Sequence, residues 1–178
     1  MRTADWIGPL ERRPREDALA ELARRYLRGH GPASERDLAW WSGLPVTVAR
    51  RAIAALGPIV ERVAADGGDL WAIAAEPPAR GGGTHLLPAF DEYTVAYRDR
   101  RAVLAPEHAS RVNAGGGILH PVIVSAGRVV GTWRRQARRG GVTVRLAPFA
   151  PLPPARRAAV AAAAKRYGAF VGLPVVVE

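Results

Sequence analysis

The sequence contains no cysteine and a single methionine among its 178 residues. Without cysteine the chain can form no disulfide framework and offers no thiolate as a nucleophile or metal ligand. It also lacks any run near the roughly 18 apolar residues of a membrane span, because Arg, Gly and Pro interrupt every candidate. Its first residues lack the apolar core of a signal peptide. We therefore expect no membrane association and a cytoplasmic location, in the nucleoid if the protein binds DNA.

Negative charge is missing from the second part of the chain. No Asp or Glu occurs between His108 and Val177, although that stretch carries 11 cationic residues. Residues 1–107 are balanced, with 15 basic and 15 acidic side chains, so the formal net charge of +10 arises in the second part. Unbalanced positive charge favours a polyanionic partner, most commonly nucleic acid. A solvated basic surface is the alternative.

The apolar pattern predicts an α+β chain, in which a winged helix-turn-helix precedes a β-rich domain with a packed C-terminal helix. Helices are expected over residues 15–30 and 37–43, the latter preceded by Ser34 as N-cap, with Ser34 and Asp37 in a capping box. A third helix and two strands joined by Asp66-Gly67-Gly68 follow. We divide the chain into an N-terminal segment, a winged-helix domain, a Pro/Gly-rich linker and a basic β-rich domain: 1–14, 15–75, 76–84 and 85–178.

The third helix, residues 46–56, has two distinct faces on a helical wheel. Apolar residues form one face at the spacing of a buried stripe: Ala49, Ala52, Ile53 and Leu56. Small, polar and cationic residues form the other: Thr47, Arg50, Arg51 and Ala54. In winged helices this is the helix that enters the DNA major groove. Thr47, Arg50 and Arg51 are therefore candidate DNA-binding residues, although packing or protein contact is the alternative use of this fold.

The β-rich part is predicted to contain three strands, a helix over residues 153–172 and a short final strand. The buried side of the helix is expected to hold Ala159, Val160, Ala163, Tyr167 and Phe170. Alternation along residues 128–139 sends Val129, Gly131 and Trp133 to one side of their strand. Four arginines gather at the end of that strand and its turn, where they can clamp a phosphate backbone: Arg134, Arg135, Arg138 and Arg139.

Catalytic signatures are scarce in the sequence. The four histidines have no metal-ligand spacing, the glycine triplets at 81–83 and 115–117 lack the Lys-Ser/Thr of a phosphate-binding loop, and no GxSxG occurs. The best carboxylate pair is Asp91-Glu92, which can supply a general base or salt-bridge partners for nearby arginines. We therefore assign no catalytic residue, no metal and no cofactor.

Several segments together resemble a known family. The phrase LLPAFDEYTVAYRDR, together with GPASERDLAWWSGLP, VNAGGGILHPVIVSAGRVVGTWRR and RYGAFVGLPV, resembles the winged-helix DNA-binding family that includes the AlkZ-like DNA glycosylases. The resemblance runs from about Trp6 to Val175. Family members are about twice as long, and this chain resembles their C-terminal half. The resemblance implies a role linked to repair of alkylated or crosslinked bases in DNA.

The chain departs from the family at its catalytic motif. The resemblance implies that a Gln-x-Asp or Gln-x-Gln pair holds the attacking water, yet the one glutamine here is Gln136 in an arginine-rich strand. Non-catalytic binding of double-stranded DNA is therefore the first hypothesis. A shortened glycosylase that uses Asp91 or Glu92 is the second. The third is a protein-interaction module, in a homodimer or with a partner chain that supplies the N-terminal half.

Overall fold

The computed structural model describes residues 12–65, 68–74 and 82–178. It divides the chain into two compact units, each formed by two segments: Met1–Pro77 with Ala96–Arg98, and Pro78–Val95 with Asp99–Glu178. Helices and strands are both present, which confirms the α+β class. Most of the predicted N-terminal segment and linker lies outside the described residues, as do Asp66 and Gly67 of the predicted turn. No helix within the described ranges is long and apolar enough to cross a membrane.

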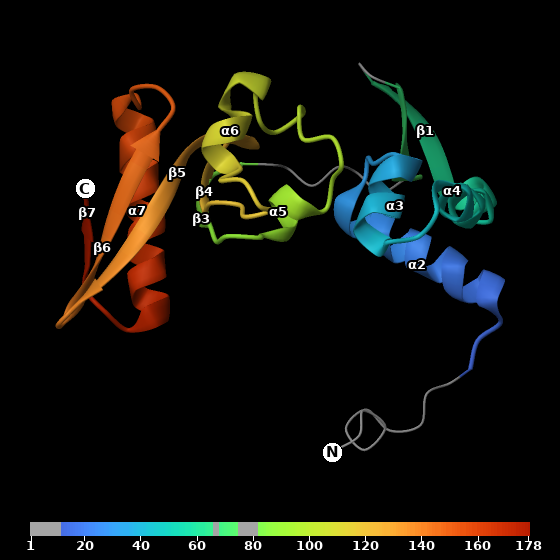
Figure 1. Cartoon of the computed structure of the whole chain (residues 1–178), viewed down its shortest axis with the longest axis horizontal. Coiled ribbons are helices and arrows are strands. Elements are labelled where there is room, and N and C mark those ends of the chain that lie inside the picture. Colours follow the sequence, from blue (N-terminus) through green and yellow to red (C-terminus); the bar gives the residue numbers. More distant parts are fainter. Residues whose placement is uncertain (1–11, 66–67, 75–81) are drawn as a thin grey trace. The chain divides into compact units, whose positions relative to one another are not determined.

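Among its described residues, the first unit contains three α-helices followed by a two-stranded antiparallel hairpin (Figure 1). A short 3-10 helix, η1 (Gly57–Ile59), connects the last helix to the hairpin. These elements agree with the predicted order, and their bounds are α2 Arg15–His30, α3 Glu35–Ser42, α4 Val46–Ala54, β1 Val60–Ala65 and β2 Gly68–Ile73. The further assignment of a DNA-binding winged helix stays a prediction.

Local capping fixes where α3 begins and ends. The Ser34 hydroxyl accepts a hydrogen bond from the Asp37 backbone N–H, and the Asp37 carboxylate accepts one from the Ser34 N–H, which is the predicted capping box. Gly43 ends the helix in the left-handed region, at φ 71°, where glycine avoids the steric penalty of a side chain. The tight turn to α4 therefore follows from residues close together in the sequence.

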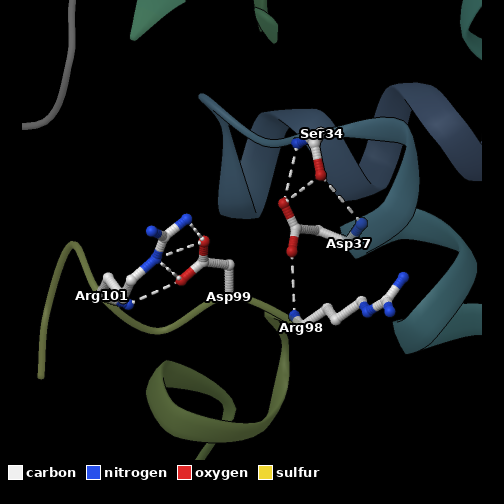
Figure 2. A network of polar contacts seen from close by, with 5 residues as sticks. All are labelled: Ser34, Asp37, Arg98, Asp99 and Arg101. Atoms are coloured by element: carbon white, nitrogen blue, oxygen red, sulfur yellow. Dashed lines mark hydrogen bonds and ion pairs between the residues drawn. The ribbon is translucent and has the colours of Figure 1, made fainter. Parts of the chain in front are cut away.

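The Asp37 carboxylate also holds a distant part of the chain, as Figure 2 shows. One of its oxygens accepts hydrogen bonds from the Ser34 N–H at 2.9 Å and the Ser34 hydroxyl at 2.6 Å. The other accepts from the Arg98 N–H at 2.9 Å. Tyr26 and Tyr97 add hydroxyl bonds to the carbonyls of Ala96 and His30, respectively. These bonds account for the inclusion of Ala96–Arg98 in the first unit.

The second unit is built on a five-stranded sheet in the order β3-β4-β5-β6-β7. Neighbouring strands are antiparallel except β6 and β7, which are parallel. The three predicted strands and the final strand are confirmed within this sheet, whose bounds are β3 Thr84–Leu87, β4 Val122–Ser125, β5 Arg128–Arg138, β6 Gly141–Pro148 and β7 Val175–Val177. The predicted alternation in β5 holds for Gly131 and Trp133 but is wrong for Val129. The register shifts between Ile123 and Val124, which pair with Gly131 and Val129, so β5 has one extra residue at this point. Val129 therefore packs in the core with Val124, whereas Trp133 packs in the other core with Ile123.

Helix α7 (Pro154–Val171) packs along one face of the sheet (Figure 1). Val160 and Ala164 are fully buried there, but Phe170, predicted on the buried side, is 88% exposed. Gly168 explains the difference, since a Cβ at that position would lie 2.6 Å from Val175 Cγ2. The closest approach of the helix thus runs along Ala164 and Gly168, and Phe170 lies outside the contact.

Short segments cover part of the opposite face. This part of the chain contains α5 (Glu92–Val95), the 3-10 helix η2 (Pro106–His108) and α6 (Ala109–Val112). Buried and partly buried apolar side chains form a second core here. Its buried members come from both the strands and these segments: Leu104, Val112, Leu119, Val122, Val124 and Val129. This core involves β4 and the beginning of β5. The arginine-rich end of β5 is therefore not part of it.

The Asp37 network predicts a large effect of a single truncation on stability. Asp37→Ala removes the capping carboxylate and leaves the N–H groups of Ser34 and Arg98 without this acceptor, so we expect a loss of about 2–4 kcal/mol in the free energy of unfolding. Asp17→Ala, at an exposed site in the first turn of α2, is the control and should cost less than about 1 kcal/mol. Urea unfolding measures both, and equal effects would contradict the role of Asp37.

Candidate nucleic-acid interface

Helix α4 presents the two faces expected from its sequence. Ala49, Ala52 and Ile53 are buried at 0–3% exposure, and Leu56 just beyond the helix is also buried. The opposite residues are all exposed: Thr47, Arg50, Arg51 and Ala54. The structure therefore brings the three candidate residues of this helix together on one solvent-facing surface.

Both α4 arginines form ion pairs with acids of other helices. Arg50 Nε lies 2.8 Å from Glu35 Oε2 of α3, and an Arg51 guanidinium nitrogen lies 2.8 Å from Glu16 Oε1 of α2. Exposed pairs of this kind contribute only about 0–1 kcal/mol each. The pairs neutralise the α4 surface in the free protein, but a stronger anionic partner can displace them at little cost. The sequence alone did not indicate these partners.

The β5–β6 hairpin divides the four arginines that the sequence grouped. Side chains alternate along the strand, so Arg134 and Arg138 share one face and Arg135 lies on the other, with Trp133. Arg135 donates a hydrogen bond to the Tyr167 hydroxyl of α7 at 3.0 Å, and this bond raises the Arg135 pKa above its usual value. Arg139 lies in the turn between β5 and β6. Arg134, Arg138 and Arg139 thus remain the outward cations of the hairpin.

The outward arginines are exposed to solvent. Within the described part of the chain, Arg134, Arg138 and Arg139 form no ion pair, and Arg138 makes a 3.4 Å contact with the Gln136 side-chain oxygen. Their position on the hairpin is set by eight β5–β6 residue pairs, from Gly131 with Pro148 to Arg138 with Gly141. We call Arg134, Arg138 and Arg139 the cationic hairpin.

Sequence reasoning missed Arg145, which lies directly opposite Arg134 in the antiparallel register. Like charges in this arrangement destabilise a sheet. Arg145 also pairs with Glu178 at 2.9 Å, the one acid that follows His108 in the sequence. Counting back from the tight turn at Arg139-Gly140 gives the Arg134–Arg145 pairing, so hairpin register was the signal that could have found it.

Asp91, the candidate general base, begins α5. Its side-chain oxygen accepts a hydrogen bond from the Tyr93 N–H at 2.9 Å, and its carbonyl accepts from the N–H groups of Thr94 and Val95. In the described ranges it forms no ion pair with the nearby arginines. Tyr93 is anchored by a 2.7 Å bond from its hydroxyl to the Gly127 carbonyl, and burial raises its pKa. The sequence alternatives, general base and arginine partner, omitted this capping role.

Two of the four histidines, His30 and His108, take part in aromatic contacts. His30 stacks on Tyr26 with 4.7 Å between ring centroids, and His108 lies 4.2 Å from the Phe149 ring. Among the residues that the structure describes, no group of three or more His, Asp or Glu side chains could hold a metal ion.

The structure thus defines an α+β protein with an exposed cationic hairpin. The model of the DNA glycosylase AlkZ-like family matches residues 1–170, and the chain belongs to that family.

Two comparisons, one of sequence and one of structure, match glycosylases of Streptomyces sahachiroi. An interstrand DNA cross-link repair glycosylase is 31% identical over 129 residues, which cover 66% of this chain and 34% of the relative. The solved structure of the DNA glycosylase AlkZ is 26% identical and superposes with a TM-score of 0.77, over 98% of this chain and 50% of that one. The chain therefore spans about half the length of the solved relative.

Gly131 predicts how sensitive the hairpin is to one methyl group. A Cβ there would lie 2.6 Å from Pro148 Cα and 2.8 Å from the Ala147 carbonyl oxygen, so Gly131→Ala should destabilise the protein by about 1–3 kcal/mol. Gly29 of α2 has nothing within 4 Å of the same position, and Gly29→Ala should instead stabilise by about 0.5–1 kcal/mol. Thermal unfolding of both variants checks the prediction. If Gly131→Ala does not lower the Tm, the strands separate easily at this position.

Proposed function

We propose that this chain binds double-stranded DNA in a DNA-repair context and does not itself cleave the base–sugar bond. The observation that carries the proposal is the cationic hairpin, whose three arginines are exposed, lie in a stretch without acids and form no ion pair with any residue that the structure describes. Phosphate contacts supply most of the affinity of such an interface and need no sequence-specific geometry. Membership in a family of DNA glycosylases supports DNA as the polyanion.

In this proposal the two arginine groups have different tasks. The cationic hairpin holds phosphates from the start of an encounter, because no internal ion pair has to break. The α4 residues Thr47, Arg50 and Arg51 enter the major groove, after Glu35 and Glu16 have released the arginines. The small side chain of Ala54 leaves room for the DNA surface on this face. Specific contacts by α4 thus follow non-specific contacts by the hairpin.

The non-catalytic part of the proposal rests on two features of this chain. Its one glutamine, Gln136, pairs across the hairpin with Thr143 and belongs to no Gln-x-Asp or Gln-x-Gln sequence. Asp91 already uses its carboxylate to begin α5. Hydrolysis of a glycosidic bond needs a placed water and a group that stabilises the sugar cation, and neither feature supplies them.

Glycosidic cleavage is the second candidate function, favoured by the family to which the chain belongs. Here Asp91 or Glu92 activates the water, or a separate chain supplies the missing catalytic residues. The relatives have about two to three times the length that matches this chain. A homodimer or a complex with such a partner is part of this candidate.

Salt-dependent binding tests the role of the cationic hairpin. In fluorescence anisotropy with a labelled duplex, log affinity should fall linearly with log salt, and replacing Arg134, Arg138 and Arg139 with Ala should shallow the slope by about three. The control replaces Arg24, Arg25 and Arg101 with Ala, which removes the same charge from arginines paired with acids. If the control weakens DNA binding as much as the hairpin variant does, the loss of net charge alone explains the effect. If the protein does not bind the duplex even at low salt, DNA binding is contradicted and a protein partner becomes the explanation for the cationic stretch.

The same titration tests α4 with two paired variants. Arg50→Ala with Arg51→Ala should weaken binding and shallow the salt slope by about two. Glu35→Gln with Glu16→Gln frees both arginines and should strengthen binding at low salt, because no internal ion pair then competes with phosphate. Unchanged affinity in the arginine variant would show that α4 is not the recognition helix.

Base release separates the two candidate functions. We expect no free base from alkylated or crosslinked duplex incubated with excess protein, measured by chromatography of the products. Release that disappears in Asp91→Asn would instead establish the glycosylase. This variant is informative because the Asn side-chain oxygen can still accept the capping bond from Tyr93.

A further inference from the structure

Phe90 is in a conformation that its side chain does not favour. It follows β3 in the turn before α5, with a backbone φ of 59°. Among the described residues, Ala126 is the one other non-glycine position with positive φ. For a bulky residue this region is a genuine outlier, and strain of this kind concentrates at functional sites.

The Phe90 side chain is also 55% exposed to solvent. Glycine would adopt the same turn without strain and without an exposed aromatic ring. The fold by itself therefore gives little reason for Phe at this position. Two unfavourable features at one residue indicate a role outside the fold.

Neighbouring residues constrain the backbone of the turn that carries Phe90. Pro88 restricts the backbone two residues earlier, and the Asp91 carbonyl next to Phe90 accepts bonds from Thr94 N–H at 2.8 Å and Val95 N–H at 3.1 Å. The Tyr93 hydroxyl ties the same segment to the β4–β5 turn through the Gly127 carbonyl. A ring on such a turn loses little conformational entropy when it binds.

The sheet register places this turn near the arginine-rich strand. Leu87, at the end of β3, pairs with Val122, which pairs with Thr132 of β5. The Trp133 indole N–H also donates to the Leu87 carbonyl at 2.8 Å. Because β3 and β5 run in the same direction, β3 ends beside the point where β5 continues into Arg134. The turn with Phe90 thus follows β3 in the direction in which β5 continues, paired with β6, toward the cationic hairpin.

We propose that Phe90 is a wedge that stacks on a nucleobase where a duplex is open or mispaired. DNA-binding proteins insert apolar side chains between bases while nearby cations hold the phosphates, and an aromatic ring stacks on any base through its π face. The inference rests on the proposed DNA binding and adds a preference for distorted duplex. Stacking of one base corresponds to roughly a five- to 150-fold gain in affinity.

The test compares a fully paired duplex with one that has a central two-base bubble containing 2-aminopurine. The wild-type chain should bind the bubble about tenfold more tightly and quench its fluorescence. Phe90→Ala and Phe90→Gly should lose both effects and keep the affinity and salt slope for paired DNA, whereas Phe90→Trp should retain them. Phe170→Ala is the matched control, because Phe170 is 88% exposed on α7, and it should behave as wild type.

Each outcome decides between the explanations. Phe90→Gly suits a positive φ, so its Tm should not fall below that of the wild type. If the wild type binds both duplexes equally without quenching, or if Phe90→Gly lowers the Tm and leaves bubble binding unchanged, the wedge is wrong and DNA binding stands. If the wild type binds neither duplex at low salt, the proposed function and the wedge fail together.

Discussion

Apolar packing of α7 on the sheet is the interaction on which the second unit depends. From His108 to Val177 no acid offsets the mutual repulsion of 11 cations, so cohesion has to come from burial. Ile123, Val144, Val160 and Ala164 supply it, each fully removed from water. The small residues of α7 allow a close approach, and the strand that carries Trp133 into this core continues outward as the arginine-rich end of β5. Repulsion among the arginines is thereby kept at the surface, where an anion can relieve it.

The two units handle positive charge in opposite ways, and this difference shapes the proposed encounter with DNA. In the first unit each α4 arginine is held by an acid of another helix, so its field is short-ranged. The outward arginines of the hairpin have no such partners in the described part of the chain, so their field extends about a Debye length, roughly 8 Å at physiological salt. In the proposed encounter the hairpin thus supplies non-specific attraction, and α4 supplies the specific contacts.

Predictions based on neighbours in the sequence were accurate where no distant partner altered the local pattern. The Ser34–Asp37 capping box, the two faces of α4 and the shared side of Gly131 and Trp133 depend on local spacing. Val129 was misplaced because the register of β5 on β4 shifts beside it. The Asp37–Arg98 bond joins residues far apart in the chain and leaves no local pattern. Phe170 was misplaced because Gly168, rather than apolar spacing alone, sets the rotation of α7. The candidate site was predicted in part, because the clustering of arginines is visible in the sequence. The sequence did not indicate that Arg135 lies on the other face of β5 or that Arg145 lies opposite Arg134. It also did not indicate the positive φ of Phe90.

The inclusion of Ala96–Arg98 in the first unit makes that unit discontinuous in the sequence. The chain leaves it, begins the second unit, returns for three residues and leaves again. A polypeptide that ended at the linker would therefore lack the N–H of Arg98 for Asp37 and the carbonyl of Ala96 for Tyr26. During synthesis the first unit acquires these bonds after LLPAFDEYTV has been made, so its completion waits for part of the second unit's sequence. The segment LLPAFDEYTV thus lies between two contributions to a single folded unit, so neither unit is a continuous stretch of the sequence.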